Sequence, residues 1–505
     1  MIARVHSAQP SILGADIVTL ETDLSRGLYS FSVVGLPDKA VEEARERISA
    51  AIKNSGFESP KSKNHKIIIS LAPADLRKEG PLFDLPMALG YMLASGDMRG
   101  NLEHTLIIGE LSLDGTIRPI RGTLPIVRAA HKAGFLNVIV PKDNAEEASL
   151  IPGITVHFAT YLREVIQHID ETRDDHSKLP IHPHTTITPS WGDSTIFLED
   201  IKGQESAKRG LLIAAAGRHN TIMVGPPGTG KTMLARAFQS ILPPLKTEEA
   251  LEVTAIHSVA GIKEGAVVTL PPFRSPHHTA SHTALVGGGT HPRPGEVTLA
   301  HRGVLFLDEF PEFDRRSIDT LRQPLEDKVV SISRIQGTAI FPADFILIAA
   351  MNPNRGGIEE FSENSMLETY KKKISGPIMD RIDLWLSVSH VAYSELTPQE
   401  TTKTISREET AKMRDIVLRA RAIQIDRFQS ETKTNATMSA RDIETHIPLA
   451  PSVATLLSES ATKLKLSPRG YHRIIKVART IADLSESKEI EAPHVLEALQ
   501  YRSRM

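Results

Sequence analysis

A glycine-rich octapeptide is the feature that most constrains the fold of this 505-residue chain. An apolar run at 221–224 precedes it, and a helix-forming run at 233–238 follows it. A strand, a glycine-rich loop and a helix in this order predict a parallel α/β sheet whose loop wraps a phosphate with backbone N–H groups. Lys231 is expected to reach the β- and γ-phosphates, and the Thr232 hydroxyl to bind Mg²⁺. The octapeptide is Gly225-Pro226-Pro227-Gly228-Thr229-Gly230-Lys231-Thr232.

The composition is that of an ordinary folded protein, and it excludes several chemistries. The chain is long enough for about two to four domains. It has no cysteine, which excludes disulfides, thiolate zinc sites and a cysteine nucleophile. Its formal net charge of -2 gives no global sign of nucleic-acid binding, although a local basic surface is sufficient for that. Without a membrane-length apolar run or a secretory signal, a cytoplasmic protein that contacts no membrane is expected.

Changes of pattern along the chain predict four regions. Residues 1–168 alternate strand-like and helix-like segments, as in a mixed α/β domain. Residues 169–195 carry a charge run followed by prolines, histidines and threonines, which is typical of a solvated linker. Residues 196–394 again alternate strand and helix, as in a parallel sheet, and residues 395–505 are predominantly helical.

Local signals predict individual elements within these regions. Asp38 is expected to cap a helix that buries one apolar stripe. Ser439 opens a capping box, and Ser467 with Pro468 is typical of a cap followed by a first-turn proline. Strands are expected in the first region at 29–34, 66–71, 106–110 and 137–141.

Two further strands are expected to bring polar groups close to the phosphate loop. The apolar run 304–307 ends in Asp308 and Glu309, at the carboxyl end of a strand, where open α/β sheets bind ligands. Asp308 is expected to hold Mg²⁺, and Glu309 to orient and activate the attacking water. The run 345–351 ends in Asn352, which either hydrogen-bonds the γ-phosphate or the lytic water, or is a turn residue before a proline.

Two arginines are candidates for neutralising charge on a γ-phosphate. Arg381 lies in a short turn, and Arg469 lies at the start of a predicted helix. A guanidinium supplied by another subunit can raise turnover greatly. Spacing alone also allows an ordinary surface ion pair, such as one between Arg381 and either Asp380 or Asp383.

The order of these motifs resembles that of an AAA+ ATPase, and long segments narrow the resemblance to the YifB/ComM family of magnesium-chelatase-like ATPases. It implies that Asn352 is sensor 1, Arg381 the arginine finger and Arg469 sensor 2. It also implies that Ile201 and Gly203 border the adenine. Such ATPases work as rings, usually hexamers, in which the arginine finger of one subunit faces the nucleotide of its neighbour. The matching segments are 34–47, 71–80, 272–281 and 294–301.

A basic segment at about 255–300 resembles the insert of this clade that projects toward the ring pore. It is expected to contact DNA phosphates or a neighbouring subunit. A metal site built from its histidines and a purely structural hairpin are the alternatives. Its basic residues are Arg274, His277, His278, His282, His291 and Arg293.

The N-terminal region resembles the Lon protease domain, and the run 109–120 matches the segment that leads to its catalytic lysine. Leu82 and Leu124 stand where that fold has its serine and its lysine, so a non-proteolytic domain is expected. Family members commonly carry a cysteine-rich zinc insertion after sensor 1. The corresponding stretch, 354–373, has no cysteine and cannot form that site.

The resemblance implies an ATP- and Mg²⁺-dependent ring motor that works on DNA. Branch migration or helicase action in the recombination of transforming DNA is the implied activity. The alternatives are a chelatase-type or protein-remodelling ATPase and, from another class, a slowly hydrolysing scaffold that recruits partners. Intact Glu309 and Arg381 argue against the scaffold.

Overall fold

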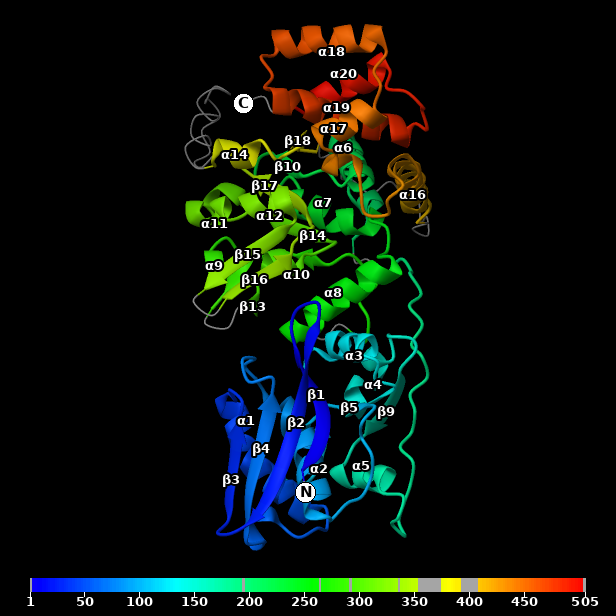
Figure 1. Ribbon diagram of the computed structural model, residues 1–505. Coiled ribbons are helices and arrows are strands. Elements are labelled where there is room, and N and C mark those ends of the chain that lie inside the picture. The colour runs from blue at the N-terminus through cyan, green and yellow to red at the C-terminus, as the bar shows by residue number, and fades with distance from the viewer. Residues whose placement is uncertain are drawn as a thin grey trace. The chain divides into compact units, whose positions relative to one another are not determined.

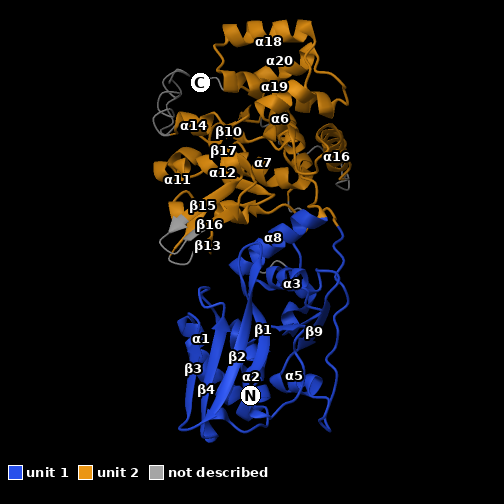
Figure 2. Cartoon of the chain, in the orientation of Figure 1, with its two compact units in different colours: residues 1–188, 247–268 blue, residues 189–246, 269–505 orange. Residues whose placement is uncertain are grey.

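The computed structural model describes residues 2–192, 196–262, 265–289, 293–334, 337–352, 374–391 and 407–502, with the side chains of 333–338 left out. The chain divides into two compact units (Figures 1 and 2). The first unit combines Met1–Thr188 with Thr247–Val268, and the second combines Pro189–Lys246 with Thr269–Met505. The first unit therefore includes a segment from the middle of the predicted ATPase region.

That segment forms helix α8 (Thr247–Ala260), which packs against helix α3 (Thr123–Lys132). Leu251 and Ala255 of α8 belong to the apolar core of the first unit. The Ser258 hydroxyl accepts a hydrogen bond from the Gly122 N–H at 3.0 Å, just before α3 begins. The predicted boundaries placed these residues in the ATPase core, but the apolar side chains of α8 are buried against the first unit.

A seven-stranded mixed sheet forms the first unit (Figure 1). Strands β2 and β4 pair antiparallel, as do β1 and β2, whereas the remaining neighbours pair parallel. All four strands predicted for this region are confirmed; the one at 137–141 has the predicted ends, and the other three shift by one or more residues at one end or both. The strand order is β3 (Ser30–Val34), β4 (His65–Ala72), β2 (Ala15–Arg26), β1 (Ala3–Pro10), β5 (Thr105–Ile107), β8 (Asn137–Pro141) and β9 (Thr155–Ala159).

Helix α1 (Lys39–Asn54) confirms the predicted cap and apolar stripe. The Asp38 carboxylate accepts a hydrogen bond from the Val41 N–H at 2.8 Å, which satisfies one of the free N–H groups at the helix start. The stripe residues Val41, Ala44, Ile48 and Ile52 are all fully buried. Helices α2 (Asp84–Ser95) and α5 (Leu162–Ile169) complete the main helices of this unit.

The first part of the predicted linker is built into the first unit. Leu179 is buried in that unit's core, and the His182 N–H donates to the Val156 carbonyl of β9 at 2.9 Å. Ile181 forms a bridge with His157 of the same strand. This pairing gives backbone groups protein partners, whereas the backbone of a solvated linker is hydrogen-bonded to water. The segment up to Thr188 is therefore part of the first unit and not of the predicted linker.

A five-stranded sheet of parallel strands forms the centre of the second unit. Val224, the last residue of β10, lies opposite Met351, and Leu307, the last residue of β14, lies opposite Ala349. This register brings the segments that follow β10, β14 and β17 to one edge of the sheet. The strand order is β11 (Phe273–Arg274), β14 (Val304–Leu307), β17 (Ile346–Met351), β10 (Thr221–Val224) and β18 (Leu384–Ser387).

The C-terminal part of the second unit is helical, as predicted. Ser439 forms its capping box with Asp442, and the Ser467 hydroxyl accepts a hydrogen bond from the Gly470 N–H at 3.1 Å. In the described parts of the chain, no helix has both the length and the apolar character needed to cross a membrane. The helices are α16 (Glu408–Phe428), α17 (Ala440–His446), α18 (Pro451–Lys463), α19 (Pro468–Leu484) and α20 (Ala492–Gln500).

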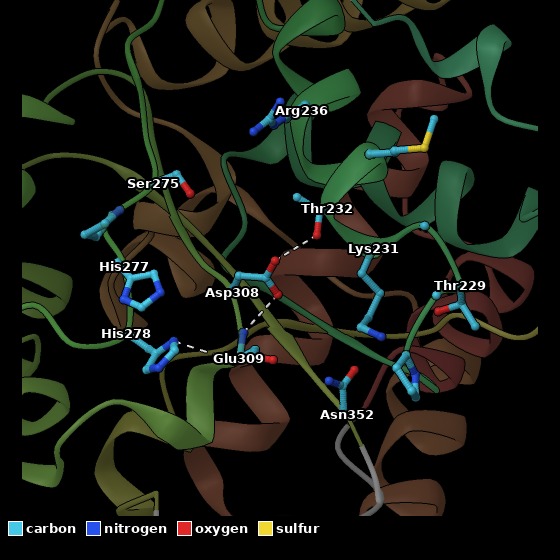
Figure 3. Close-up of a pocket in the computed structure, with 15 residues that line it drawn as sticks. Thr229, Lys231, Thr232, Arg236, Ser275, His277, His278, Asp308, Glu309 and Asn352 are labelled. Atoms are coloured by element: carbon cyan, nitrogen blue, oxygen red, sulfur yellow. Dashed lines mark hydrogen bonds and ion pairs between the residues drawn. The ribbon is translucent and has the colours of Figure 1, made fainter. Parts of the chain in front are cut away.

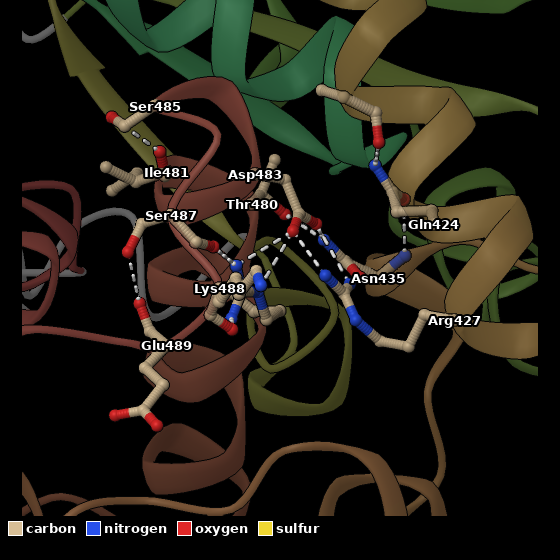
Figure 4. Close-up of polar contacts among 12 residues, drawn as sticks. Gln424, Arg427, Asn435, Thr480, Ile481, Asp483, Ser485, Ser487, Lys488 and Glu489 are labelled. Atoms are coloured by element: carbon tan, nitrogen blue, oxygen red, sulfur yellow. Dashed lines mark hydrogen bonds and ion pairs between the residues drawn. The ribbon is translucent and has the colours of Figure 1, made fainter.

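A buried carboxylate ties these helices together (Figure 4). Asp483 of α19 is fully buried, and it accepts hydrogen bonds from Arg427 of α16, from Arg479 of its own helix at 3.0 Å and from Asn435 at 2.7 Å. Helices α16 and α19 in turn both contact α6 (Glu205–Gly217) beside the sheet. A fully buried carboxylate is compatible with a stable fold only when positive charges and hydrogen-bond donors surround it, as they do here.

Replacing Asp483 by alanine is expected to destabilise the second unit strongly. Arg427 and Arg479 lose the carboxylate that compensates their buried charge, which costs about 3–5 kcal/mol of unfolding free energy. Urea denaturation of the variant measures this loss. Asp415→Ala is the matched control, because Asp415 pairs with Arg419 at 3.1 Å on an exposed helix face, a contact expected to contribute at most about 0.5 kcal/mol. Equal losses in both variants contradict the assignment.

Candidate nucleotide-binding site

The glycine-rich loop joins β10 to helix α7 (Lys231–Phe238) and has the predicted conformation for approach by a phosphate. Gly228 and Gly230 have φ values of +78° and +89°, in the left-handed region that favours glycine. A Cβ on Gly225 would lie 1.9 Å from the Val388 carbonyl oxygen. Only glycine fits where the loop leaves β10 beside the end of β18. The strand, loop and helix predicted from the sequence are therefore confirmed.

A cavity of about 680 Å³ opens between this loop and the ends of β11, β14 and β17 (Figure 3). Its volume is in the range of sites for small ligands and cofactors. The lining residues are Pro227, Gly228, Thr229, Gly230, Lys231, Thr232, Met233, Arg236, Ser275, Pro276, His277, His278, Asp308, Glu309 and Asn352.

Lys231 is held inside the loop by two backbone carbonyls. Its Nζ donates to the carbonyl oxygens of Gly225 and Pro226, both at 2.7 Å. Burial lowers the pKa of the ammonium, and the Asp308 carboxylate opposes that shift. The two carbonyls act as hydrogen-bond acceptors for the ammonium group where the loop curves around the cavity. A phosphate oxygen could replace them as the ammonium's acceptor.

Thr232 and Asp308 meet across the cavity floor. The Thr232 hydroxyl donates to Asp308 Oδ2 at 2.7 Å, and Asp308 Oδ1 accepts from the Glu309 N–H at 2.9 Å (Figure 3). A hydroxyl and a carboxylate are the hard oxygen donors that suit Mg²⁺, which is commonly held by few protein groups together with phosphates and water. The donor set therefore fits the magnesium site predicted from the sequence.

Glu309 has an unusual backbone and a neighbour that the sequence did not predict. Its φ of +49° is uncommon for a residue with a Cβ. Its Oε2 lies 3.5 Å from Nδ1 of His278, and His277 stacks on His278 with ring centroids 4.1 Å apart. Asn352 lines the same cavity at the end of β17. The structure thus brings Asp308, Glu309 and Asn352 together with the loop.

His277 and His278 line the nucleotide-site cavity, a position that the sequence did not predict. Both follow β11, which pairs parallel with β14, so they emerge at the edge of the sheet that carries Asp308. Arg274 is bound to Glu296 through two hydrogen bonds of 2.7 and 2.9 Å. The pairing of a two-residue strand is what positions these side chains, and the sequence offered no periodic signal for it.

The rest of the basic segment differs in accessibility. His282 lies on helix α9 (His282–Val286), where the Thr283 hydroxyl contacts its Nε2 at 3.3 Å. Arg293 is exposed in a small hairpin of β12 (Gly287–Gly288) and β13 (Arg293–Pro294). Among the described residues, no group of three or more His, Cys, Asp or Glu side chains is arranged to hold a metal ion. His291 lies outside the described residues, as does the cysteine-free stretch 354–373.

Neither predicted arginine is among the described residues that line the cavity. The Arg381 guanidinium pairs with Glu326 of helix α12 (Arg322–Asp327) and donates to the Pro377 carbonyl at 2.5 Å. The spacing-based alternatives, Asp380 and Asp383, are not the partners in that ion pair. Arg469 is exposed and lines a separate cavity of about 200 Å³ beside the Arg381 turn. Arg469 therefore lies beside the turn that bears Arg381, and neither arginine lines the cavity at the loop of its own chain.

The residues expected at the adenine are not among those that line the cavity. Ile201 is buried after a short 3-10 turn, and Gly203 has a φ of +61°. The next residue, Gln204, donates to the Ser389 carbonyl at 2.5 Å. The segment is thus attached beside the loop, and an adenine contact by Ile201 and Gly203 stays a prediction.

Sequence reasoning missed four cavity residues besides the two histidines. Met233 and Arg236 lie on α7, Arg236 four positions after Thr232, and the exposed side chain of Arg236 borders the cavity (Figure 3). Ser275 and Pro276 follow β11. The helical spacing of Arg236 from the loop could have revealed it, whereas Ser275 and Pro276 depended on strand pairing.

Comparison with known proteins covers the whole chain. Three family models match: "Magnesium chelatase, subunit ChlI" at residues 197–396, "Subunit ChlI of Mg-chelatase" at 20–144 and "Magnesium chelatase, subunit ChlI C-terminal" at 407–502. The competence protein ComM of Haemophilus influenzae is 42% identical over 99% of this chain and 97% of its own length. The uncharacterized protein YifB of Escherichia coli is 40% identical over 99% of this chain and 96% of its own length.

A partial likeness to a protease accompanies these matches. Lon protease 1 of Bacillus subtilis is 27% identical over 31% of this chain and 21% of its own length. The residues expected to replace the protease serine and lysine, Leu82 and Leu124, are both buried in the core of the first unit. Apolar side chains in that core supply neither a nucleophile nor a base.

Replacing Gly225 by alanine is expected to weaken ATP binding by on the order of tenfold or more, because forcing a methyl group against the Val388 carbonyl costs about 1–3 kcal/mol. Titration with a fluorescent ATP analogue measures the effect. Gly14→Ala is the control, since a Cβ there comes no closer than 3.7 Å to any atom. Unchanged binding in Gly225→Ala contradicts the close approach of loop and strand.

Proposed function

The chain belongs to the YifB/ComM family of magnesium-chelatase-like AAA+ ATPases, and we propose that it is an ATP-hydrolysing ring motor that works on DNA. One observation supports assembly into a ring. The phosphate loop, Asp308, Glu309 and Asn352 line one cavity, whereas Arg381 and Arg469 lie elsewhere in the same unit. Arg236 is the arginine in the described cavity lining, and the two arginines expected at the γ-phosphate are not part of that lining, so a second copy is proposed to supply them.

In this proposal the residues of the cavity divide the work on ATP. Loop N–H groups and Lys231 bind the phosphates, with the ammonium exchanging its loop carbonyls for phosphate oxygens. Thr232 and Asp308 hold Mg²⁺, which when bound neutralises charge on the phosphates. Glu309 orients the attacking water and accepts its proton, and Asn352 hydrogen-bonds the γ-phosphate or that water.

The two arginines act across the interface in this proposal. Arg381 leaves Glu326, whose side chain is 59% exposed, and its guanidinium turns to the γ-phosphate bound by the neighbouring subunit. An exposed carboxylate is a weak competitor for this guanidinium, because surface ion pairs contribute at most about 1 kcal/mol. Arg469 lies beside the same turn and reaches the same phosphates. Closed rings, commonly hexamers, repeat this heterologous contact around the assembly.

DNA is proposed as the polymer on the basis of the relatives and one exposed feature. The H. influenzae relative is named a competence protein, which fits recombination of DNA taken up by the cell through branch migration or helicase action. Arg293 on the exposed β12–β13 hairpin is the candidate phosphate contact. The family models are named for magnesium chelatase, which favours a chelatase-type or protein-remodelling ATPase as the second candidate.

Glu309→Gln is expected to retain ATP binding and lose turnover by on the order of 10²-fold or more, because the amide cannot accept a proton from water. Steady-state phosphate release and nucleotide titration measure the two properties separately. Glu312→Gln is the control, since Glu312 lies three residues away and does not line the cavity. Normal turnover in Glu309→Gln removes Glu309 from its proposed role.

DNA dependence distinguishes the two candidate functions. The ATPase rate is expected to rise with single strands or four-way junctions, and ATP is expected to drive movement of a labelled junction. Arg293→Ala is expected to lose part of the DNA stimulation and to keep the DNA-free rate, since Arg293 does not line the nucleotide cavity. If no DNA form stimulates the ATPase and no junction moves, the DNA motor is excluded in favour of the second candidate.

A further inference from the structure

Three successive backbone carbonyls in the turn that carries Arg381 are each held by a side chain. Arg473 donates from Nη1 to the Ile382 carbonyl at 2.8 Å and from Nη2 to the Asp380 carbonyl at 2.6 Å. Between these two bonds, Asn220 donates from Nδ2 to the carbonyl of Arg381 itself at 3.0 Å. The backbone of Arg381 is therefore clamped on both sides.

One half of this clamp is fixed to the central sheet. Asn220 directly precedes β10, the strand that leads into the phosphate loop. Its Oδ1 accepts from the Leu347 N–H of β17 at 2.9 Å, and its carbonyl accepts from the Asp383 N–H at 2.9 Å. Because the side-chain amide of Asn220 forms a hydrogen bond through both its oxygen and its nitrogen, its orientation is fixed. Asn220 therefore holds the Arg381 carbonyl at a fixed position relative to the sheet.

The other half belongs to the helical part of the unit. Arg473 lies on α19 with its side chain 13% exposed, and its guanidinium lies 3.8 Å from the Asp380 carboxylate and 4.0 Å from that of Asp383. A planar guanidinium donates to the two carbonyls from two different nitrogens held in a fixed fork, whereas the ammonium of a lysine is a single donor atom without that fixed geometry. Two nearby carboxylates and low exposure keep this fork in place.

The same helix carries Arg469, four residues before Arg473. Residues four apart in a helix lie on the same face, and the two arginines line the same small cavity with Asp380. The start of α19 is fixed by the Ser467 cap. Arg473 therefore links the turn that bears Arg381 to the helix that carries Arg469.

We propose that Arg473 is a positioning residue that sets the direction of Arg381, so that helix α19 delivers Arg381 and Arg469 together to the nucleotide of the neighbouring subunit. This inference rests on the proposed two-subunit site. It assigns to the helical region a part in catalysis through Arg473, in addition to the proposed action of Arg469.

The first test separates positioning from nucleotide binding. Arg473→Ala is expected to lower kcat by on the order of 10²-fold, the cost of misplacing a catalytic group by about 1 Å. Its affinity for a fluorescent ATP analogue is expected to be unchanged, since the loop, Thr232 and Asp308 are untouched. Arg473→Lys is expected to fall between Arg473→Ala and the native protein. Arg421→Ala is the matched control, because Arg421 also donates from this helical region to a backbone carbonyl near the sheet, that of Ala215 at 2.7 Å, without touching the Arg381 turn.

The second test uses mixed assemblies and distinguishes misdirection from misfolding. Arg473→Ala subunits keep an intact loop site, and Glu309→Gln subunits keep an intact Arg381. Mixing the two inactive proteins before assembly is expected to give an ATPase rate several-fold above the sum of the separate rates. Arg381→Ala mixed with Glu309→Gln is the reference, and it is expected to be rescued in the same way.

The outcomes of the two tests are distinct. Rescue of Arg381→Ala without rescue of Arg473→Ala overturns the positioning role and leaves the two-subunit site intact. A kcat for Arg473→Ala equal to that of Arg421→Ala also overturns it. If Arg381→Ala itself is not rescued, the two-subunit site fails, and the positioning role fails with it.

Discussion

Parallel pairing of β10, β14 and β17 is the constraint on which the nucleotide site depends. Because parallel strands end at the same edge, the loop after Val224, the carboxylates after Leu307 and the amide after Met351 converge although they are far apart in sequence. The side chains of β14 and β17 are buried on both faces, so a slip that moved either strand further into the sheet would draw Asp308 or Asn352 into the apolar interior. The positions of the polar groups at this edge of the sheet are therefore fixed by the packing of the buried strands that precede them.

Charge burial fixes the helical region as firmly as apolar packing fixes the sheet. Asp483 joins α16 to α19, and the fully buried His219 connects Asp383 at 3.0 Å to Thr480 of α19 at 2.8 Å. Directional bonds of this kind define one arrangement of helix and sheet, whereas apolar contacts tolerate sliding. A helix attached in this way can carry Arg469 and the Arg473 clamp as one rigid part.

Some of this could be read from the sequence and some could not. The loop, the carboxylates after β14 and the caps at Asp38 and Ser467 are local patterns, and each is confirmed because a single strand or helix end produces it. His277 and His278 were assigned to a pore loop, yet they line the nucleotide cavity because the two-residue strand β11 pairs with β14. Helix α8 was assigned to the ATPase core, yet its apolar side chains pack in the first unit. Both depend on contacts between segments that carry no local signal.

The sequence by itself determined the class of fold, the phosphate loop and the identity of the groups around it, because backbone geometry and short-range spacing encode them. Through the resemblance to Lon it also predicted that this region does not cleave peptides, since Leu82 and Leu124 stand where the serine and the lysine are expected. Tertiary structure alone decided that Arg469 lies beside the turn that bears Arg381 and that neither arginine lines the cavity at the loop of its own chain. That grouping arises from Arg473 reaching across from α19 to backbone carbonyls of a distant turn, and no spacing within one segment encodes a hydrogen bond between two.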